Sequence, residues 1–264
     1  MAGETCHNKV VFTIDLNADA GESFGHWQVA DEAALFPQLS SVNLACGFHA
    51  GDPLTMQRSV ALAKRLGVAI GAHPGFDDKP GFGRRDIAAT GEQIFTDTLY
   101  QLGALQAFLK GEGLPMHHVK AHGALYLKMM KDEETARAFS EAVATFNQKL
   151  ALVVLAGKGG ELMQKVGQEL GLRVVSEAFP DRAYLANGQL APRSLPGSVL
   201  DEPELIAQRA VMLAKGEAIT ALDGGEVSVR AETLCLHGDN PHAPKTAAAV
   251  RQALEAASIR IQAF

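Results

Sequence analysis

Residues 43–53 read Asn-Leu-Ala-Cys-Gly-Phe-His-Ala-Gly-Asp-Pro and predict the end of a buried strand, a turn and the start of a helix. Asp52 can accept a hydrogen bond from the first N–H groups of that helix, and Pro53 has the φ angle that its first turn requires. Glycines on both sides of His49 allow the backbone to turn sharply there. The stretch therefore places a histidine just past the carboxyl end of a strand.

The same order of strand, turn and helix recurs along the chain. Strands are predicted at 10–16, 42–45, 68–72, 118–121, 151–156, 173–176 and 232–236, with weaker candidates at 218–222, 226–229 and 259–263. Between them lie helical patterns, of which the clearest run from 53 to 67, from 90 to about 110, and from 201 to about 215. Sustained alternation implies a parallel sheet, and this many units favour a closed barrel over an open sheet. We expect a single α/β domain, a β/α barrel spanning residues 1–264.

Composition limits the classes of partner. The chain has 264 residues, 47% of them hydrophobic, which is enough for a full core. A net charge of -6 gives no reason to expect nucleic acid or a membrane surface as partner. No apolar run approaches the roughly 20 residues that span a bilayer, and the first residues do not resemble a signal peptide. Three cysteines fit a reducing cytosol, so a cytoplasmic location is expected.

Polar side chains follow the carboxyl ends of several predicted strands. They are Asp19, Glu22, His49, His73, His122, Glu177, His237 and Asp239. Any single histidine among them is as easily an ordinary loop residue, but four at equivalent strand ends favour a shared site. Barrel enzymes place their active sites at this end, and histidine can give or take a proton near neutral pH.

A bound metal is left open by the sequence. Histidines beside Asp19 or Glu22 suit a divalent ion, but the chain has no compact His-x-x-x-His or Cys-x-x-Cys spacing. If a metal is present, the expected ligands are Asp19, His49, His73 and His122. Cys46 and Cys235 are interpreted as small buried strand residues rather than nucleophiles.

Two charged groups have both a structural and a functional interpretation. Asp15, Asn17 and Asp19 alternate along the first strand and are expected to point into the barrel, where Lys120 can neutralise them. This is either a structural ion pair or a network that orients substrate. Arg84 and Arg85 lie in a glycine-rich loop that we expect to be mobile, and their guanidinium groups match carboxylate or phosphate oxygens. Alternatively, they pair with nearby aspartates in solvent.

Seven motifs in this chain, taken together, resemble those of the LamB/YcsF family. They are residues 15–25 (Asp-Leu-Asn-Ala-Asp-Ala-Gly-Glu-Ser-Phe-Gly), 43–53, 71–75 (Gly-Ala-His-Pro-Gly), 82–85 (Phe-Gly-Arg-Arg), 119–126, 181–184 (Asp-Arg-Ala-Tyr) and 235–239. They occur in the family's order and span nearly the whole chain. Ala121, Leu127 and Pro180 depart from the family's usual Pro, Asn and Ala.

The resemblance implies a distorted seven-stranded β/α barrel of the TIM-like, glycoside hydrolase/deacetylase type. It also implies an ATP-dependent 5-oxoprolinase that opens 5-oxo-L-proline to L-glutamate. Two partner subunits, B and C, are implied, with ATP and Mg²⁺ as co-substrate of the complex. Phosphorylation of the lactam oxygen would make it a leaving group, and water could then attack the ring carbon.

Strand-end positions and the resemblance together suggest the site residues. Catalytic roles are expected for Asp19, Glu22, His49, His73, Lys120, His122 and His237. Substrate or phosphate binding is expected for Asn17, Asn43, Arg84, Arg85, Tyr126, Glu177 and Asp239. Two other classes stay open: a metal-dependent amidohydrolase like the carbohydrate deacetylases, and a non-catalytic scaffold subunit.

Overall fold

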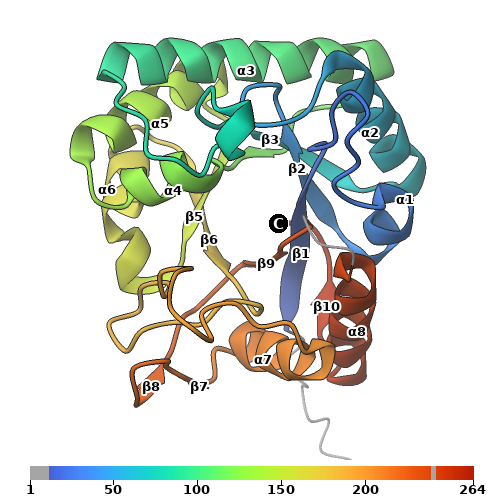
Figure 1. Ribbon diagram of the computed structural model, residues 1–264, viewed down its shortest axis with the longest axis vertical. Helices are drawn as coiled ribbons and strands as arrows, with labels where there is room; N and C mark the ends of the chain where they lie inside the picture. Colours follow the sequence, from blue (N-terminus) through green and yellow to red (C-terminus); the bar gives the residue numbers. More distant parts are fainter. Residues whose placement is uncertain (1–11, 239–241) are drawn as a thin grey trace, which may run out of the picture.

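Seven parallel strands form a closed barrel in the computed structural model, which describes residues 12–238 and 242–264 (Figure 1). In order around the barrel these are β1 (Thr13–Ala20), β2 (Ser41–Ala45), β3 (Ala69–His73), β4 (His118–Val119), β5 (Ala151–Leu155), β6 (Arg173–Ala178) and β9 (Thr233–Leu236). β9 pairs with both β6 and β1, and the second pairing closes the barrel. The predicted seven-stranded β/α barrel is confirmed.

Helices surround the barrel (Figure 1). They are α1 (Glu32–Leu35), α2 (Pro53–Leu66), α3 (Gly91–Glu112), α4 (Gly123–Met129), α5 (Glu133–Asn147), α6 (Glu161–Glu169), α7 (Pro203–Lys215) and α8 (Ala243–Ala256). Short 3-10 helices occupy Phe36–Gln38, Lys79–Gly81 and Gly157–Gly160. α2 begins as predicted, because Asp52 accepts a hydrogen bond from the Thr55 N–H at 2.8 Å.

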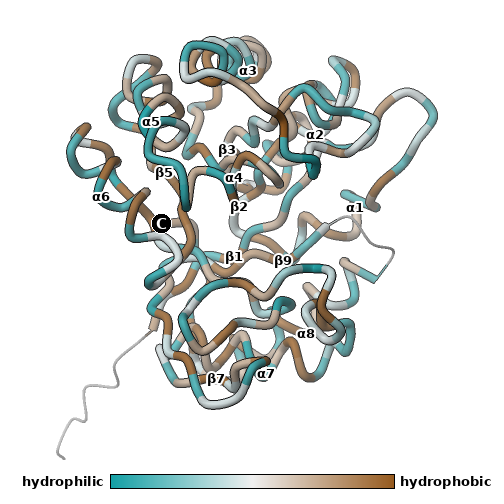
Figure 2. Tube along the Cα trace, turned by 60° about the vertical axis from the view of Figure 1, so that its left-hand side comes forward, coloured by the Kyte–Doolittle hydropathy of each residue, from teal (hydrophilic) through white to brown (hydrophobic). Residues whose placement is uncertain are grey.

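Hydrophobic packing follows the predicted periodicity. Hydrophilic and hydrophobic stretches alternate around the turns of α3 and α5, as an amphipathic helix requires (Figure 2). All five residues of β5 are buried, which is typical of a strand covered on both faces. Each large apolar side chain removed from water in this core stabilises the fold by about 1.5–3 kcal/mol.

Three short strands are not among the seven that form the closed ring. β7 (Ile219–Thr220) and β8 (Glu226–Val227) form a small antiparallel pair of their own (Figure 1). β10 (Arg260–Ile261) pairs with the start of β1, and Phe264 then contacts His117 and His118 at the amino-terminal end of the barrel. Within the described residues, no helix has the length and apolar character needed to cross a bilayer.

Candidate active site

Lys120 lies directly after β4 in the barrel interior and is only 2% exposed. Its Nζ is 3.0 Å from Asp19 Oδ1, 3.0 Å from Glu177 Oε1 and 3.0 Å from Cys235 Sγ. These three partners come from β1, β6 and β9, so the ammonium group joins strands from across the barrel. The predicted pairing of Lys120 with a carboxylate of the first strand is present.

The charges in this network support one another. Burial alone would lower the pKa of Lys120, but attraction led by Asp19 outweighs it and raises the pKa above its ordinary value. Burial raises the pKa of Asp19, yet His73 and Lys120 outweigh it and bring the pKa well below the ordinary range. Burial raises the pKa of the Cys235 thiol. The cysteine is therefore a neutral partner of Lys120, and not an activated nucleophile.

Beneath Lys120, buried amides continue the network toward the other end of the barrel. The Asn17 side chain donates to Glu177 Oε1 at 3.2 Å, and Asn43 donates to Asn17 Oδ1 at 2.7 Å. His118 Nε2 lies 2.6 Å from Asn43 Oδ1. Neither Asn17 nor Asn43 lines the cavity described below. These two predicted binding residues fill the barrel interior, where they position Asp19 and Glu177.

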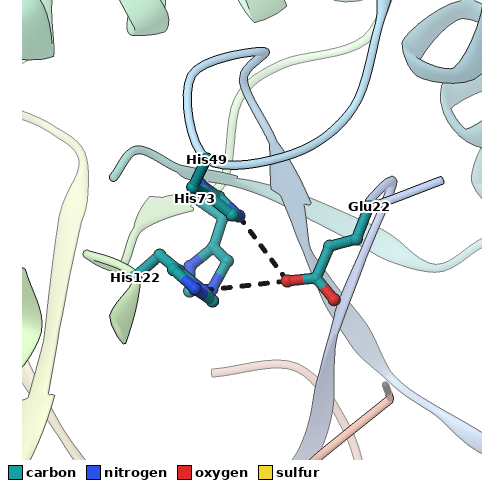
Figure 3. A group of neighbouring side chains, drawn as sticks. All are labelled: Glu22, His49, His73 and His122. Atoms are coloured by element: carbon teal, nitrogen blue, oxygen red, sulfur yellow. Dashed lines mark hydrogen bonds and ion pairs between the residues drawn. The ribbon is translucent and has the colours of Figure 1, made fainter. Parts of the chain in front are cut away.

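Glu22, His49, His73 and His122 form a second buried group beside this network, which we call the histidine cluster (Figure 3). One nitrogen or oxygen from each lies within 4.8 Å of the others. Glu22 Oε1 is 3.5 Å from His49 Nε2 and 3.7 Å from His122 Nδ1, while His73 Nε2 and His122 Nδ1 are 3.0 Å apart. The acid in this cluster is Glu22, whereas the expected metal set had Asp19.

The rings of His49 and His122 are packed together, and their surroundings favour the neutral form of both. His49 and His122 stack in parallel with ring centroids 3.8 Å apart. Burial, followed by the charges of neighbouring histidines, holds the pKa of both rings well below the usual value. Neutral imidazole is the form that can accept a proton or bind an ion.

Glycines let the chain approach the histidine cluster closely. A Cβ atom at Gly83 would lie 2.6 Å from the Cβ of His49, and one at Gly75 would lie 2.7 Å from His49 Nδ1. Asp78 accepts from the N–H of Gly81, and the Gly83 carbonyl accepts from Ala124 N at 2.9 Å. The loop expected to be mobile is thus fixed in place against the cluster.

Arg84 and Arg85 have different surroundings. Arg84 lines the cavity and lies over the Phe82 ring, with its guanidinium carbon 5.0 Å from the ring centroid. Arg85 pairs with Asp78, and its side chain is 63% exposed. The alternative of a solvent-side pair with a nearby aspartate therefore describes Arg85, whereas Arg84 faces the cavity.

A cavity of about 400 Å³ opens beside both groups at the carboxyl ends of the strands. Of the predicted site residues, it is lined by Asp19, His73, Arg84, Lys120, His122, Tyr126 and His237. Arg182, Arg193 and Lys131 also line it, although sequence reasoning assigned them no role. Among the described residues that line the cavity, Asp19 is the one acid beside five lysines and arginines, so this part of the wall is strongly cationic. Such a wall favours an anionic small molecule.

His237 is held at the cavity wall by Asp181. The carboxylate accepts from the backbone N–H of His237 at 3.0 Å and lies 2.7 Å from Nδ1 of the ring. Burial raises the pKa of Asp181, but His237 outweighs burial and the net pKa is lowered. An ionised aspartate on Nδ1 fixes the tautomer and orientation of the imidazole.

Asp239, another predicted binding residue, lies outside the described residues.

The irregular segment 179–200 brings Asp181, Arg182 and Arg193 to the site. Arg209 of α7 donates to the carbonyls of Pro180 at 3.0 Å and Arg182 at 2.9 Å, which anchors the segment. Arg182 in turn donates to Ala191 O at 2.7 Å. The signal that was available is the Asp-Arg-Ala-Tyr motif at 181–184, to which the sequence alone assigns no function.

These features define the class of protein: a TIM-like β/α barrel with buried histidines and carboxylates beside a cationic cavity at the strand ends. The sequence profile of the LamB/YcsF family matches residues 14–264, and the chain belongs to that family.

Relatives match over nearly the full length. A Thermus thermophilus protein named as the A subunit of 5-oxoprolinase is 57% identical over 95% of this chain and 99% of that protein. The Deinococcus radiodurans protein of the same name is 53% identical over 92% of this chain and 93% of its own. The crystal structure of a lactam utilization protein from Thermus thermophilus superposes with a TM-score of 0.90, at 56% identity, over 96% of this chain and 100% of that one.

Proposed function

We propose that this chain acts as the A subunit of an ATP-dependent 5-oxoprolinase, which opens 5-oxo-L-proline to L-glutamate together with two partner subunits, B and C. The cationic cavity supports the proposal most directly, because 5-oxoproline carries a carboxylate and a phosphorylated form of it carries further negative charge. Identity of 57% with a protein named for this role supports the same assignment.

The reaction needs phosphoryl transfer because a lactam is an unactivated amide. Transfer of the γ-phosphoryl group of ATP to the lactam oxygen gives ADP and a phosphorylated ring. Water then adds to the ring carbon, loses a proton to a base, and the C–N bond breaks as its nitrogen is protonated. The product of that step is γ-glutamyl phosphate, and a second water releases phosphate and glutamate.

Three groups of side chains are suited to these steps. His237, oriented by Asp181, is placed to move the proton between water and the ring nitrogen. Arg84 and the other lining arginines can hold the carboxylate or phosphate oxygens. Lys120 can stabilise negative charge on the lactam oxygen, and a well-placed donor of this kind is worth about 3–4 kcal/mol.

The test is ATP-dependent release of glutamate by the chain reconstituted with the B and C subunits. We expect little activity from the isolated chain. His237→Gln should lower turnover by about 10²–10⁴-fold, and Arg84→Ala should raise KM by about tenfold or more. Arg85→Ala is the matched comparison, and its KM should stay near wild type because Arg85 pairs with Asp78 outside the cavity.

Other outcomes would redirect the assignment. Full activity of both His237→Gln and Arg84→Ala in the complex would indicate a scaffold subunit. Amide hydrolysis by the isolated chain, without ATP and sensitive to chelators, would indicate an amidohydrolase related to the deacetylases.

A further inference from the structure

We propose that Glu22, His49, His73 and His122 form a binding site for one divalent transition-metal ion, for which Zn²⁺ is the representative probe. All four side chains are buried, and their donor atoms lie within 4.8 Å of one another (Figure 3). Histidine nitrogens and a carboxylate oxygen are usual zinc ligands. The site deepens the proposed function because it borders the cavity, where a metal ion would supply a Lewis acid. Metal binding can nevertheless be measured without turnover.

Backbone carbonyls determine which nitrogens can bind the ion. A carbonyl oxygen only accepts, so His73 donates from Nδ1 to Lys120 O at 2.8 Å, and His122 donates from Nε2 to Phe82 O at 2.8 Å. When each ring carries only the proton that it donates to its carbonyl, lone pairs remain on His73 Nε2 and His122 Nδ1, which face each other at 3.0 Å. Two lone pairs at this distance repel each other, and a cation bound by both nitrogens would remove that repulsion. Carbonyl acceptors on the outer nitrogen are also the usual support of metal-binding histidines.

Three of the donor–donor distances within the histidine cluster are close to those of ligands around one ion. Two nitrogens about 2.1 Å from a metal lie about 3.0 Å apart at a right angle and about 3.4 Å apart at the tetrahedral angle. The His73–His122 nitrogens are 3.0 Å apart, and Glu22 Oε1 is 3.5 Å from His49 Nε2 and 3.7 Å from His122 Nδ1. Ordinary metal coordination would therefore need small side-chain shifts only.

His49 gives an independent reason to expect a ligand. It is 1% exposed, and neither of its ring nitrogens has a hydrogen-bond partner within the described residues. Buried polar atoms are nearly always partnered, so an imidazole in this position indicates that something is bound there. The backbone at Gly75 and Gly83 approaches His49 so closely that a Cβ at Gly75 would collide with its ring and a Cβ at Gly83 would collide with its Cβ.

The donor set also selects the kind of metal. Three imidazoles suit Zn²⁺, Co²⁺, Ni²⁺ or Fe²⁺, whereas Mg²⁺ prefers oxygen ligands and keeps several waters. The site is therefore distinct from the Mg²⁺ expected with ATP. The competing occupant is a proton on His73 Nε2, shared between Asp19 Oδ2 at 3.2 Å and His122.

The experiment is a Zn²⁺ titration of chelator-treated full-length protein by calorimetry, with Co²⁺ absorption as a second readout. We expect one equivalent bound by the wild type, and affinity at least tenfold weaker in Glu22→Gln and His49→Gln. The matched control is His118→Gln, which replaces an equally buried histidine outside the cluster and should keep wild-type affinity. Millimolar Mg²⁺ should not compete.

Several results would overturn the site. These are the absence of saturable Zn²⁺ binding, unchanged affinity in both cluster variants, or an equal loss in His118→Gln. If a variant fails to fold, thermal unfolding of the wild type decides, since Zn²⁺ but not Mg²⁺ must raise its melting temperature. A cluster that holds only a proton would show no such rise. Metal binding without oxoprolinase activity in the reconstituted complex would remove the proposed function and leave the metal site.

Discussion

Two buried polar groups lie side by side at the mouth of this barrel and differ in how completely their atoms are hydrogen-bonded. The ammonium of Lys120 has three partners at 3.0 Å, and the amides beneath it continue an unbroken chain of hydrogen bonds. In the histidine cluster, the ring of His49 has no hydrogen bond within the described residues. Lys120 and His49 are both almost fully buried, so burial alone does not distinguish a structural network from a binding site. What distinguishes the two groups is whether every buried polar atom has a hydrogen-bond partner.

The physical reason lies in desolvation. Every buried ion or dipole loses its bonds to water, and a protein recovers that free energy only through well-placed partners. The network around Lys120 recovers it from the protein itself. The histidine cluster recovers only part of it, and the proposed metal ion would supply the rest.

The largest effect should come from breaking the complete network. Lys120→Met leaves Asp19 and Glu177 without their shared cation, and removal of one partner of a buried pair costs about 3–5 kcal/mol. For a chain of this size that lowers the melting temperature by roughly 10 °C. Calorimetry or circular dichroism measures it, with Lys131→Met as control, an exposed lysine that lines the same cavity. Equal melting temperatures for the two variants would show that the network does not stabilise the barrel.

Much of this architecture could be predicted from the sequence. Repeated strand–turn–helix patterns indicate a parallel barrel, and they place the residues that follow each strand at the carboxyl-terminal end of that barrel. α4 was not predicted, since it is short and follows β4 directly, with no side-chain cap at His122. The pairing of Lys120 with the acids of β1 was one of the two stated alternatives, because residue alternation sets which side chains point inward.

The sequence could not predict that Asp19 joins the Lys120 network while Glu22 joins the histidine cluster. Asp19 and Glu22 are three residues apart, and the positive φ of 69° at Gly21 separates the end of β1 from the turn that carries Glu22. Asp181 and Arg182 arrive from an irregular segment whose course depends on Arg209 of a later helix. No periodicity encodes such contacts.

The second prediction tests the wall of the histidine cluster. Gly83→Ala places a Cβ 2.6 Å from that of His49, at a residue whose φ is 62°. Left-handed backbone and overpacking together should cost about 2–4 kcal/mol. Gly103→Ala is the control: it lies exposed in α3 with no described atom within 4 Å of the new Cβ, and alanine there should slightly stabilise the helix. Urea unfolding of both variants measures the difference. Equal free energies of unfolding would mean that the loop containing Gly83 can shift to accommodate the new Cβ at little cost.

The third prediction compares two buried histidines directly. His118 and His49 are each 1% exposed, but His118 Nε2 lies 2.6 Å from Asn43 Oδ1, whereas His49 has no such partner in the described part of the chain. In metal-free protein, His118→Gln should therefore lower the free energy of unfolding by about 1–3 kcal/mol more than His49→Gln. Unfolding curves recorded with a chelator present give both values. A larger loss for His49→Gln would reverse the comparison.

The smallest effect on stability is expected at Asp181. In completeness of hydrogen bonding, this residue lies between the Lys120 network and the histidine cluster. One of its oxygens serves both the backbone N–H and the ring of His237, while Oδ1 has no hydrogen-bond partner within the described residues. Asp181→Asn keeps the shape and weakens the bonds to His237, at a cost of about 1 kcal/mol near neutral pH.

The contribution of Asp181 to the free energy of unfolding should decrease at low pH. The folded-state pKa of Asp181 lies below the unfolded value of about 3.9, so its contribution is complete above that pH and is lost as the pH falls through the folded pKa. The part of the stability difference between wild type and Asp181→Asn that depends on the ionised carboxylate should accordingly shrink as the pH falls below about 4. Urea unfolding at pH 7, 5, 4 and 3 tests this, with the exposed Asp201→Asn as control. A difference that grows between pH 4 and pH 3 would mean that His237 does not hold the carboxylate ionised, and Asp181 would then resemble the incompletely bonded histidine cluster more than the Lys120 network.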